Sequence, residues 1–235
     1  MRKGKSEFQR SESFPIGVLL ALTGGFLDAY TYVDRGGVFA NAQTGNMVLL
    51  GIRLSQGAWR QAVFCFVPIV AFAAGVLLAE LIQQTYKRST KLHWRQRTVL
   101  LETVILLLVG FVPAGKLDSG VNVAISFVCA MQVESFRKIH GLSYATTMCT
   151  GNLRSGTENL FHYCKSGEKK WLWNSLKYYC IIAVFIVGAF LGCLATNVFA
   201  EKAVWSACIF LVAAFLLMNQ KAERRKKTEG KTGAD

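Results

Sequence analysis

Two short polar stretches interrupt a chain that is otherwise strongly apolar. Residues 40–51 read ANAQTGNMVLLG, and the triplet Thr-Gly-Asn returns within TTMCTGNLRSG at residues 146–156. An asparagine side chain offers two N–H donors and one acceptor, and glycine lets the backbone turn tightly or approach a ligand closely. Exposed backbone N–H groups at such a segment attract an anion or a dipole. The two stretches are therefore predicted to form the two halves of one polar site.

The elements that must position these stretches are long apolar runs. Examples are residues 62–82, 178–199 and 203–218, in a chain of 235 residues of which 52% are apolar and 17% charged. A helix that crosses a bilayer core needs about 20 mostly apolar residues. The sequence therefore predicts an all-α integral membrane protein. Spans are expected at residues 14–33, 62–84, 98–115, 119–136, 176–199 and 203–218.

The positive charges set the expected orientation. Lys and Arg gather at residues 85–97, within 137–175 and in the C-terminal tail, and cytoplasmic loops retain such residues. Both termini are therefore expected in the cytoplasm of a bacterium, with the protein in its inner membrane. The expected parts are a basic N-terminus (1–13), a first membrane repeat (14–115), a second membrane repeat (116–218) and a basic disordered tail (219–235).

An alternative counts residues 38–52 and 142–160 as two further full spans. It would export the basic loop 85–97 and would place Asn41 and Arg154 in lipid. Each buried polar group without a partner costs roughly 2–7 kcal/mol. We therefore favour six spans, with the Thr-Gly-Asn stretches as broken or re-entrant segments that face protein or a water-filled cavity.

A weak internal repeat relates the two halves. A shift of 106 residues aligns Thr44-Gly45-Asn46 with Thr150-Gly151-Asn152, Asp28 with Glu134, and Asn41 with Thr147. Beyond these stretches a shift of 113 residues aligns Phe72 with Phe185 and Gly75 with Gly188. With six spans, the two copies form a three-plus-three inverted repeat. Such repeats are typical of secondary transporters, whose site lies where broken helices meet near the midplane.

Individual residues carry more specific expectations. Thr44 and Thr150 are expected to cap half-helices, and Gly45 and Gly151 to allow a tight bend. Asp28 would face a partner, a cavity or a proton path, or else form a structural ion pair with Arg35 or Arg137. The residues predicted to bind substrate or line a pore are Asp28, Asn41, Gln43, Thr44, Gly45, Asn46, Gln132, Glu134, Thr146, Thr147, Thr150, Gly151 and Asn152.

Two further expectations concern packing. The small residues Gly75, Ala79, Gly188 and Gly192 have the spacing that lets membrane helices approach closely. Glu102, near the start of an expected span, is predicted to lie at the membrane interface.

The polar stretches also carry a family resemblance. GGFLDAYTYVDRGGVFANAQTGNMVLLG, followed by MQVESFRKIHGLSYATTMCTGNL, resembles the YoaK-like family of uncharacterised bacterial membrane proteins. The likeness extends from about residue 14 to 218. It implies a bacterial cytoplasmic-membrane protein, for which small-molecule transport has been suggested, and supplies no substrate. Glu134 departs from the neutral residue expected at its position.

The leading functional prediction is a secondary transporter or facilitator for a small polar molecule. A passive channel and a non-transporting scaffold or partner subunit remain as alternatives. An enzyme is not predicted, because the sequence has no serine–histidine constellation, metal-binding histidine motif or pair of intramembrane aspartates. No cofactor or metal is expected, and the seven cysteines are predicted to act as small apolar residues. The expected partners are membrane lipid and a small-molecule substrate, with a homo-oligomer left open.

Nucleic acid is not an expected partner, although the formal net charge is +13. The basic residues lie outside the apolar runs and do not alternate with aromatic residues that could stack bases.

Overall fold

The structure is a computed structural model that describes residues 12–87, 93–139, 141–147 and 149–232. The described part is helical apart from the antiparallel strand pair β1 (Lys138–Ile139) and β2 (Leu142–Ser143), in which Lys138 lies opposite Ser143. A 3₁₀ turn, η2 (Ala200–Ala203), separates the last two helices. The α-helices are α1 (Phe14–Asp34), α2 (Gln43–Ser55), α3 (Trp59–Tyr86), α4 (Trp94–Val109), α5 (Asp118–Ser135), α6 (Cys149–Ser166), α7 (Lys169–Phe199) and α8 (Val204–Thr232).

Three stretches are long and apolar enough to cross a membrane, judged by length and composition. They are Phe14–Asp34, Trp59–Tyr86 and Lys169–Asn219, the last of which includes α7 and the beginning of α8. Large apolar side chains on these helices are exposed, such as Leu77 at 67% and Phe190 at 63%, as lipid-facing residues would be. The helices α4 and α5 have 16 and 18 residues and are less apolar, so the count of six spans stays a prediction.

The Thr-Gly-Asn stretches open two regular helices and are not broken segments. The N-cap of α2 is Ala42 and makes no side-chain cap, so Thr44 lies inside the first turn. Thr150 likewise lies inside α6, which begins at Cys149. The expectation of threonine caps was therefore wrong. So was the expectation of bends at Gly45 and Gly151, because the positive φ angles fall at other glycines: Gly36 (85°), Gly37 (73°) and Gly141 (78°).

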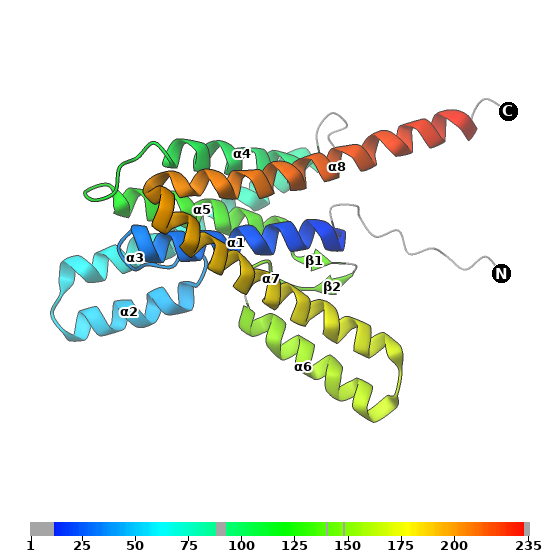
Figure 1. Ribbon diagram of the computed structural model, residues 1–235, viewed down its shortest axis with the longest axis horizontal. Helices are drawn as coiled ribbons and strands as arrows, with labels where there is room; N and C mark the ends of the chain where they lie inside the picture. Colours follow the sequence, from blue (N-terminus) through cyan, green and yellow to red (C-terminus); the bar gives the residue numbers. More distant parts are fainter. Residues whose placement is uncertain (1–11, 88–92, 140, 148, 233–235) are drawn as a thin grey trace.

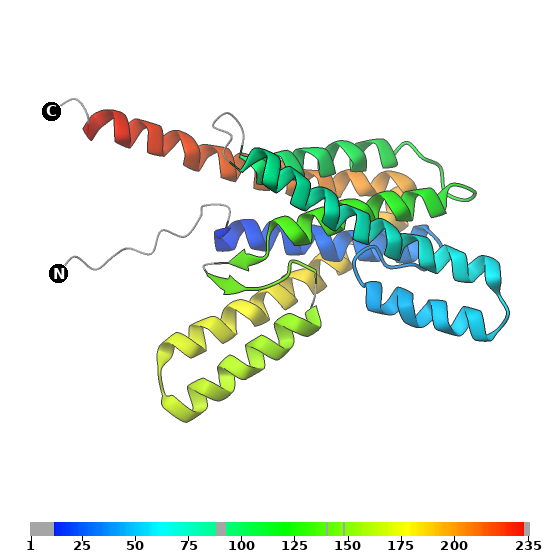
Figure 2. The same ribbon diagram turned by 180° about the vertical axis from the view of Figure 1, so that it is seen from behind.

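The two helical hairpins lie at opposite ends of the molecule. In Figure 1 the connection of α2 to α3 is at the left, and the connection of α6 to α7 is at the lower right; Figure 2 shows the same arrangement from behind. The helix α1 begins, and α8 ends, at the end that holds the α6–α7 connection. The tail predicted to be disordered is helical to Thr232, and residues 1–11 of the predicted N-terminal segment lie outside the described residues.

Each half of the chain packs its long helices against the other half. The most extensive contacts join α1 to α7 and α3 to α5. Glycines make this possible: a Cβ added at Gly188 would collide with the Leu22 carbonyl of α1, and one at Gly75 with the Phe127 carbonyl of α5. The predicted close approach at these small residues is confirmed.

The main core lies between α1, α4, α5 and α8. Leu27, Leu106 and Leu211 are fully buried there. Glu102 is also 0% exposed, contrary to the expected interfacial position, and neither carboxylate oxygen has a hydrogen-bond partner in the described part of the chain. The reason is that α4 begins at Trp94, four residues before the predicted span, so Glu102 lies two turns inside the helix.

Candidate functional site

The starts of both Thr-Gly-Asn helices meet at one cavity of about 660 Å³. The helices α1, α3 and α7 complete its walls. Its polar residues are Asp28, Asn41, Gln43, Thr44, Thr147, Cys149 and Thr150, and its aromatic residues are Tyr32, Phe39, Phe72 and Phe185.

The first segment is tied back to α1 by Asn41. After the turn at Gly36 and Gly37, the Asn41 backbone N–H donates to Asp28 Oδ1 at 2.7 Å. The Asn41 side chain donates from Nδ2 to the Gly24 carbonyl of α1 at 3.1 Å. Asp28 and Asn41 are both buried, so this pair fixes where the carboxylate meets the beginning of α2.

An asparagine closes the loop before each of the two helices. In the first half the Phe39 N–H donates to Asn46 Oδ1 at 3.2 Å, and Asn46 Nδ2 donates to the Phe39 carbonyl at 2.7 Å. In the second half Asn152 forms the same two bonds with Ala145, at 3.3 and 2.7 Å. We call this double hydrogen bond the asparagine clasp. The same shift of 106 residues relates both partners, so the repeat extends to individual hydrogen bonds.

The second segment lacks the polar network of the first. Thr147, the counterpart of Asn41, is buried, and its Oγ1 has no hydrogen-bond partner among the described residues. In the first half Gln43 donates to the Ala40 carbonyl at 2.9 Å and accepts from Asn46, whereas its counterpart is Cys149. Burial, and after it the charge of Asp28, raises the pKa of the Cys149 thiol to about 11.

Glu134, the counterpart of Asp28, lies outside the cavity. Its carboxylate forms an ion pair with Arg137 at 3.0 Å, and Arg137 also contacts Glu80 of α3 at 3.1 Å. These residues line a separate, more polar depression near the start of α4. The two equivalent acids therefore have different surroundings.

The structure brings together seven of the predicted site residues and distributes the others around them. Gln132 donates to the Leu20 carbonyl at 3.2 Å and to Thr146 Oγ1 at 3.1 Å, which ties the second segment to α1 and α5. Gly45 lines a neighbouring depression beside Phe39. The seven that line the cavity are Asp28, Asn41, Gln43, Thr44, Thr147, Thr150 and Gly151.

The aromatic walls were not predicted as part of the site. Phe72 of α3 and Phe185 of α7 contribute equivalent positions of the two halves, and Tyr32 stacks on Phe39 with ring centroids 4.9 Å apart. The shift of 113 residues that pairs Phe72 with Phe185 was the available signal.

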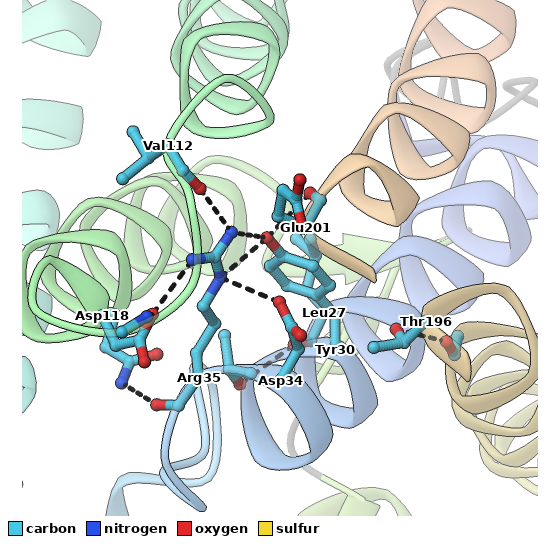
Figure 3. A network of polar contacts seen from close by, with 12 residues as sticks. Leu27, Tyr30, Asp34, Arg35, Val112, Asp118, Thr196 and Glu201 are labelled. Carbon is cyan, nitrogen blue, oxygen red and sulfur yellow. Dashed lines mark hydrogen bonds and ion pairs between the residues drawn. The ribbon is translucent and has the colours of Figure 1, made fainter. Parts of the chain in front are cut away.

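Asp28 does not pair with Arg35, which was the structural alternative. Arg35 is fully buried, and Figure 3 shows its guanidinium surrounded by Tyr30, Asp34, Asp118 and the Val112 carbonyl. It donates to the Tyr30 hydroxyl at 2.7 Å and to Asp118 Oδ1 at 3.0 Å. The Tyr30 hydroxyl donates in turn to the Glu201 carbonyl at 3.0 Å. Arg35 therefore joins the end of α1 to the α4–α5 connection and η2.

Comparison with known proteins identifies the family. Residues 16–217 match the family described as "Protein of unknown function (DUF1275)". The chain belongs to the DUF1275 family. It is also similar to the UPF0700 transmembrane protein YoaK of Bacillus subtilis (strain 168), with 24% identity over 213 residues, which are 88% of this chain and 95% of that protein. No solved structure matches. The family resemblance predicted from the sequence is confirmed.

The DUF1275 match and the transmembrane relative support a membrane protein and leave the chemistry to the cavity. Within the residues described, no three His, Cys, Asp or Glu side chains are grouped as a metal ion would require. The cavity instead offers one carboxylate, several amide and hydroxyl groups, and aromatic rings. This combination suits the binding of a small organic molecule with polar and apolar parts.

Proposed function

We propose that this DUF1275 protein is a secondary transporter or facilitator that moves a small polar molecule across the bacterial cytoplasmic membrane. The observation that carries the proposal is the single cavity lined from both Thr-Gly-Asn helices, with the buried Asp28 in its wall. An ionisable group within a membrane helix is costly, and it generally marks a substrate, ion or proton pathway. The function requires neither a cofactor nor a catalytic group.

The two halves are proposed to form an inverted repeat. Three observations support this: the hairpins at opposite ends of the molecule, the asparagine clasp in each half, and the crossed packing of α1 with α7 and α3 with α5. In transporters with this symmetry, a site between the repeats is opened alternately to the two sides of the membrane. The cavity between the two clasps is the corresponding position here.

The proposed orientation places the beginning of α1 and the end of α8 on the cytoplasmic side. The ends of α3 and α4 at this side carry Lys87, Arg95 and Arg97, as expected for cytoplasmic loops. Labelling of single thiols tests the orientation. Each protein would retain one thiol, either native Cys164 near the α6–α7 connection or Gln56→Cys at the α2–α3 connection. A membrane-impermeant maleimide should reach Cys164 only in inverted vesicles and the Gln56→Cys thiol only in intact cells. Labelling of both from one face would rule out the inverted repeat.

Transport itself is tested in proteoliposomes. The vesicles would be incubated with a mixture of small polar metabolites and washed, and their contents identified by mass spectrometry. At least one solute should enter with a saturable rate, and its uptake should fall at least tenfold in Thr44→Ala/Thr150→Ala. Gly51→Ala, on an open face of α2, is the matched control. Uptake no faster than in protein-free vesicles would overturn the proposal, and a non-saturating rate would favour the passive channel.

A further inference from the structure

We infer that the molecule bound in the cavity carries a protonated amino group, which lies beside Asp28 between the aromatic walls. The inference rests on the proposed function, because it takes the cavity to be the substrate site. It names the chemical class of the ligand as a small organic ammonium ion with N–H donors.

The charge of the cavity walls is the first argument. Asp28 contributes a carboxylate, and no Lys, Arg or His belongs to the described residues that line the cavity. The nearby Arg35 is engaged with Asp34 and Asp118. A carboxylate held away from water is stabilised by a cation with which it can form hydrogen bonds. The lining therefore favours a positively charged ligand over a neutral or negative one.

The beginning of α2 offsets this negative charge only in part. Asp28 Oδ1 accepts the Asn41 N–H, and the backbone N–H groups of Ala40 and Ala42 also face the carboxylate. A helix N-terminus corresponds to roughly half a positive charge. About half of the negative charge of Asp28 therefore remains for a ligand to balance.

The neighbouring acceptors favour a ligand that brings donors. Asn41 Oδ1 and Thr147 Oγ1, on opposite halves of the repeat, have no hydrogen-bond partner in the part of the chain described, and both side chains are more than nine-tenths buried. The Asn41 amide is oriented by the bond from Nδ2 to the Gly24 carbonyl. An ammonium group can donate up to three hydrogen bonds, whereas a quaternary ammonium ion could satisfy none of these acceptors.

The aromatic residues complete the match. Tyr32, Phe39, Phe72 and Phe185 line the same cavity as Asp28. Aromatic faces attract cations and also accommodate the apolar part of an organic amine. A cavity of about 660 Å³ is far larger than a bare metal ion requires.

Cys149 provides a reporter within the cavity wall. The wild-type protein in nanodiscs would be labelled with N-ethylmaleimide, and the rate followed at each thiol by peptide mass spectrometry. Phenethylammonium should slow labelling of Cys149 at least fivefold with saturable dependence, while 2-phenylethanol and 3-phenylpropionate should not. Cys164, exposed on α6 and outside the cavity, is the internal control. Protection by the alcohol or the carboxylate to the same extent, by sodium chloride alone, or by none of the compounds would overturn the inference.

Substitution at equivalent positions assigns the effect to Asp28. Asp28→Asn should weaken protection by phenethylammonium about tenfold or more, because hydrogen bonds to a charged group are lost. Glu134→Gln, at the counterpart position outside the cavity, should leave it unchanged. Equal protection in Asp28→Asn and wild type would contradict the role of Asp28. Protection by the carboxylate would overturn the ligand class but keep the cavity as a transport site; failed uptake together with ammonium protection would overturn transport alone.

Discussion

The two Thr-Gly-Asn segments share one hydrogen-bonding device and differ in nearly everything around it. Asn46 and Asn152 each clasp the backbone of the residue seven positions earlier, with distances that agree within 0.1 Å (3.2 and 2.7 Å against 3.3 and 2.7 Å). In contrast, Asp28 lines the cavity while its counterpart Glu134 pairs with Arg137 elsewhere. The groups that shape the segments are repeated, and the groups that set the charge of the cavity are not.

This difference divides the site into two roles. The first half supplies the charge and a connected set of amides, and the second half supplies hydroxyl and thiol groups with few protein partners. A symmetric scaffold therefore holds an asymmetric cavity, as recognition of a molecule with distinct ends would require. The predictions below test the shared part first and the divergent part afterwards.

The largest expected effect is at the crossed helix contacts. Gly75→Leu and Gly188→Leu would each press a side chain onto a backbone carbonyl of the facing helix. Because backbone cannot move aside as a side chain can, each should cost more than about 3 kcal/mol, above the usual range for overpacking. Thermal unfolding in detergent would measure this, with Gly51→Ala as a control that is neutral or about 1 kcal/mol more stable. Tolerance in only one half would show that the packing is not equivalent.

Loss of the asparagine clasp should have the next largest effect, and it should be equal in the two halves. Asn46→Ala and Asn152→Ala each remove two hydrogen bonds and leave a backbone N–H and carbonyl without their partner. The expected cost is about 2–3 kcal/mol each. Urea or thermal unfolding of both variants provides the comparison. A difference above about 1 kcal/mol would mean that the clasp supports one half more than the other.

The counterparts Asn41 and Thr147 should respond differently. Asn41→Ala removes the bond to the Gly24 carbonyl and is expected to cost about 1–2 kcal/mol. Thr147→Val replaces a buried hydroxyl that has no partner in the described residues with a methyl group of similar size, so stability should be unchanged or slightly higher. The unfolding temperatures of the two variants test this, and a strongly destabilised Thr147→Val would reveal a partner for the hydroxyl.

The smallest predicted effect reports how far the charge of Asp28 reaches. Its negative charge contributes to the raised pKa of the Cys149 thiol, which is about 11. Asp28→Asn should lower that pKa, increase the thiolate fraction at pH 8, and speed maleimide labelling of Cys149 about two- to threefold without added ligand. Glu134→Gln and the Cys164 rate serve as controls. An unchanged or slower Cys149 rate would contradict the electrostatic link between the halves.

The long helices and the repeat could be predicted from the sequence, because both depend on local pattern. The first span, expected at 14–33, is the helix Phe14–Asp34, since an apolar run bounded by polar residues fixes its own limits. The polar Thr-Gly-Asn stretches were misjudged as irregular, because their cost in lipid was counted without the partners that α3 and α7 provide. The family was also correctly predicted from the motifs.

The contacts between distant residues could not be predicted. The bonds of Arg35 reach Asp118 and, through Tyr30, the Glu201 carbonyl, and nothing local in the sequence connects these positions. Likewise Asp28 and Glu134 occupy equivalent places in the repeat, and only the turn at Phe136 and the neighbouring Arg137 lead the second acid away from the cavity. A sequence repeat specifies equivalent backbone positions and leaves the surroundings of each side chain open.

The crossed packing has a consequence for synthesis of the protein. The glycine face of α1, where Gly25 meets Phe185 and Gly188 meets Leu22, is covered only by α7. At 5–20 residues per second, roughly ten to thirty seconds separate the emergence of these two helices from the ribosome. During that interval the first half has no partner for this face and depends on lipid or the insertion machinery to cover it. The fold is therefore completed late, when the last third of the chain has entered the membrane.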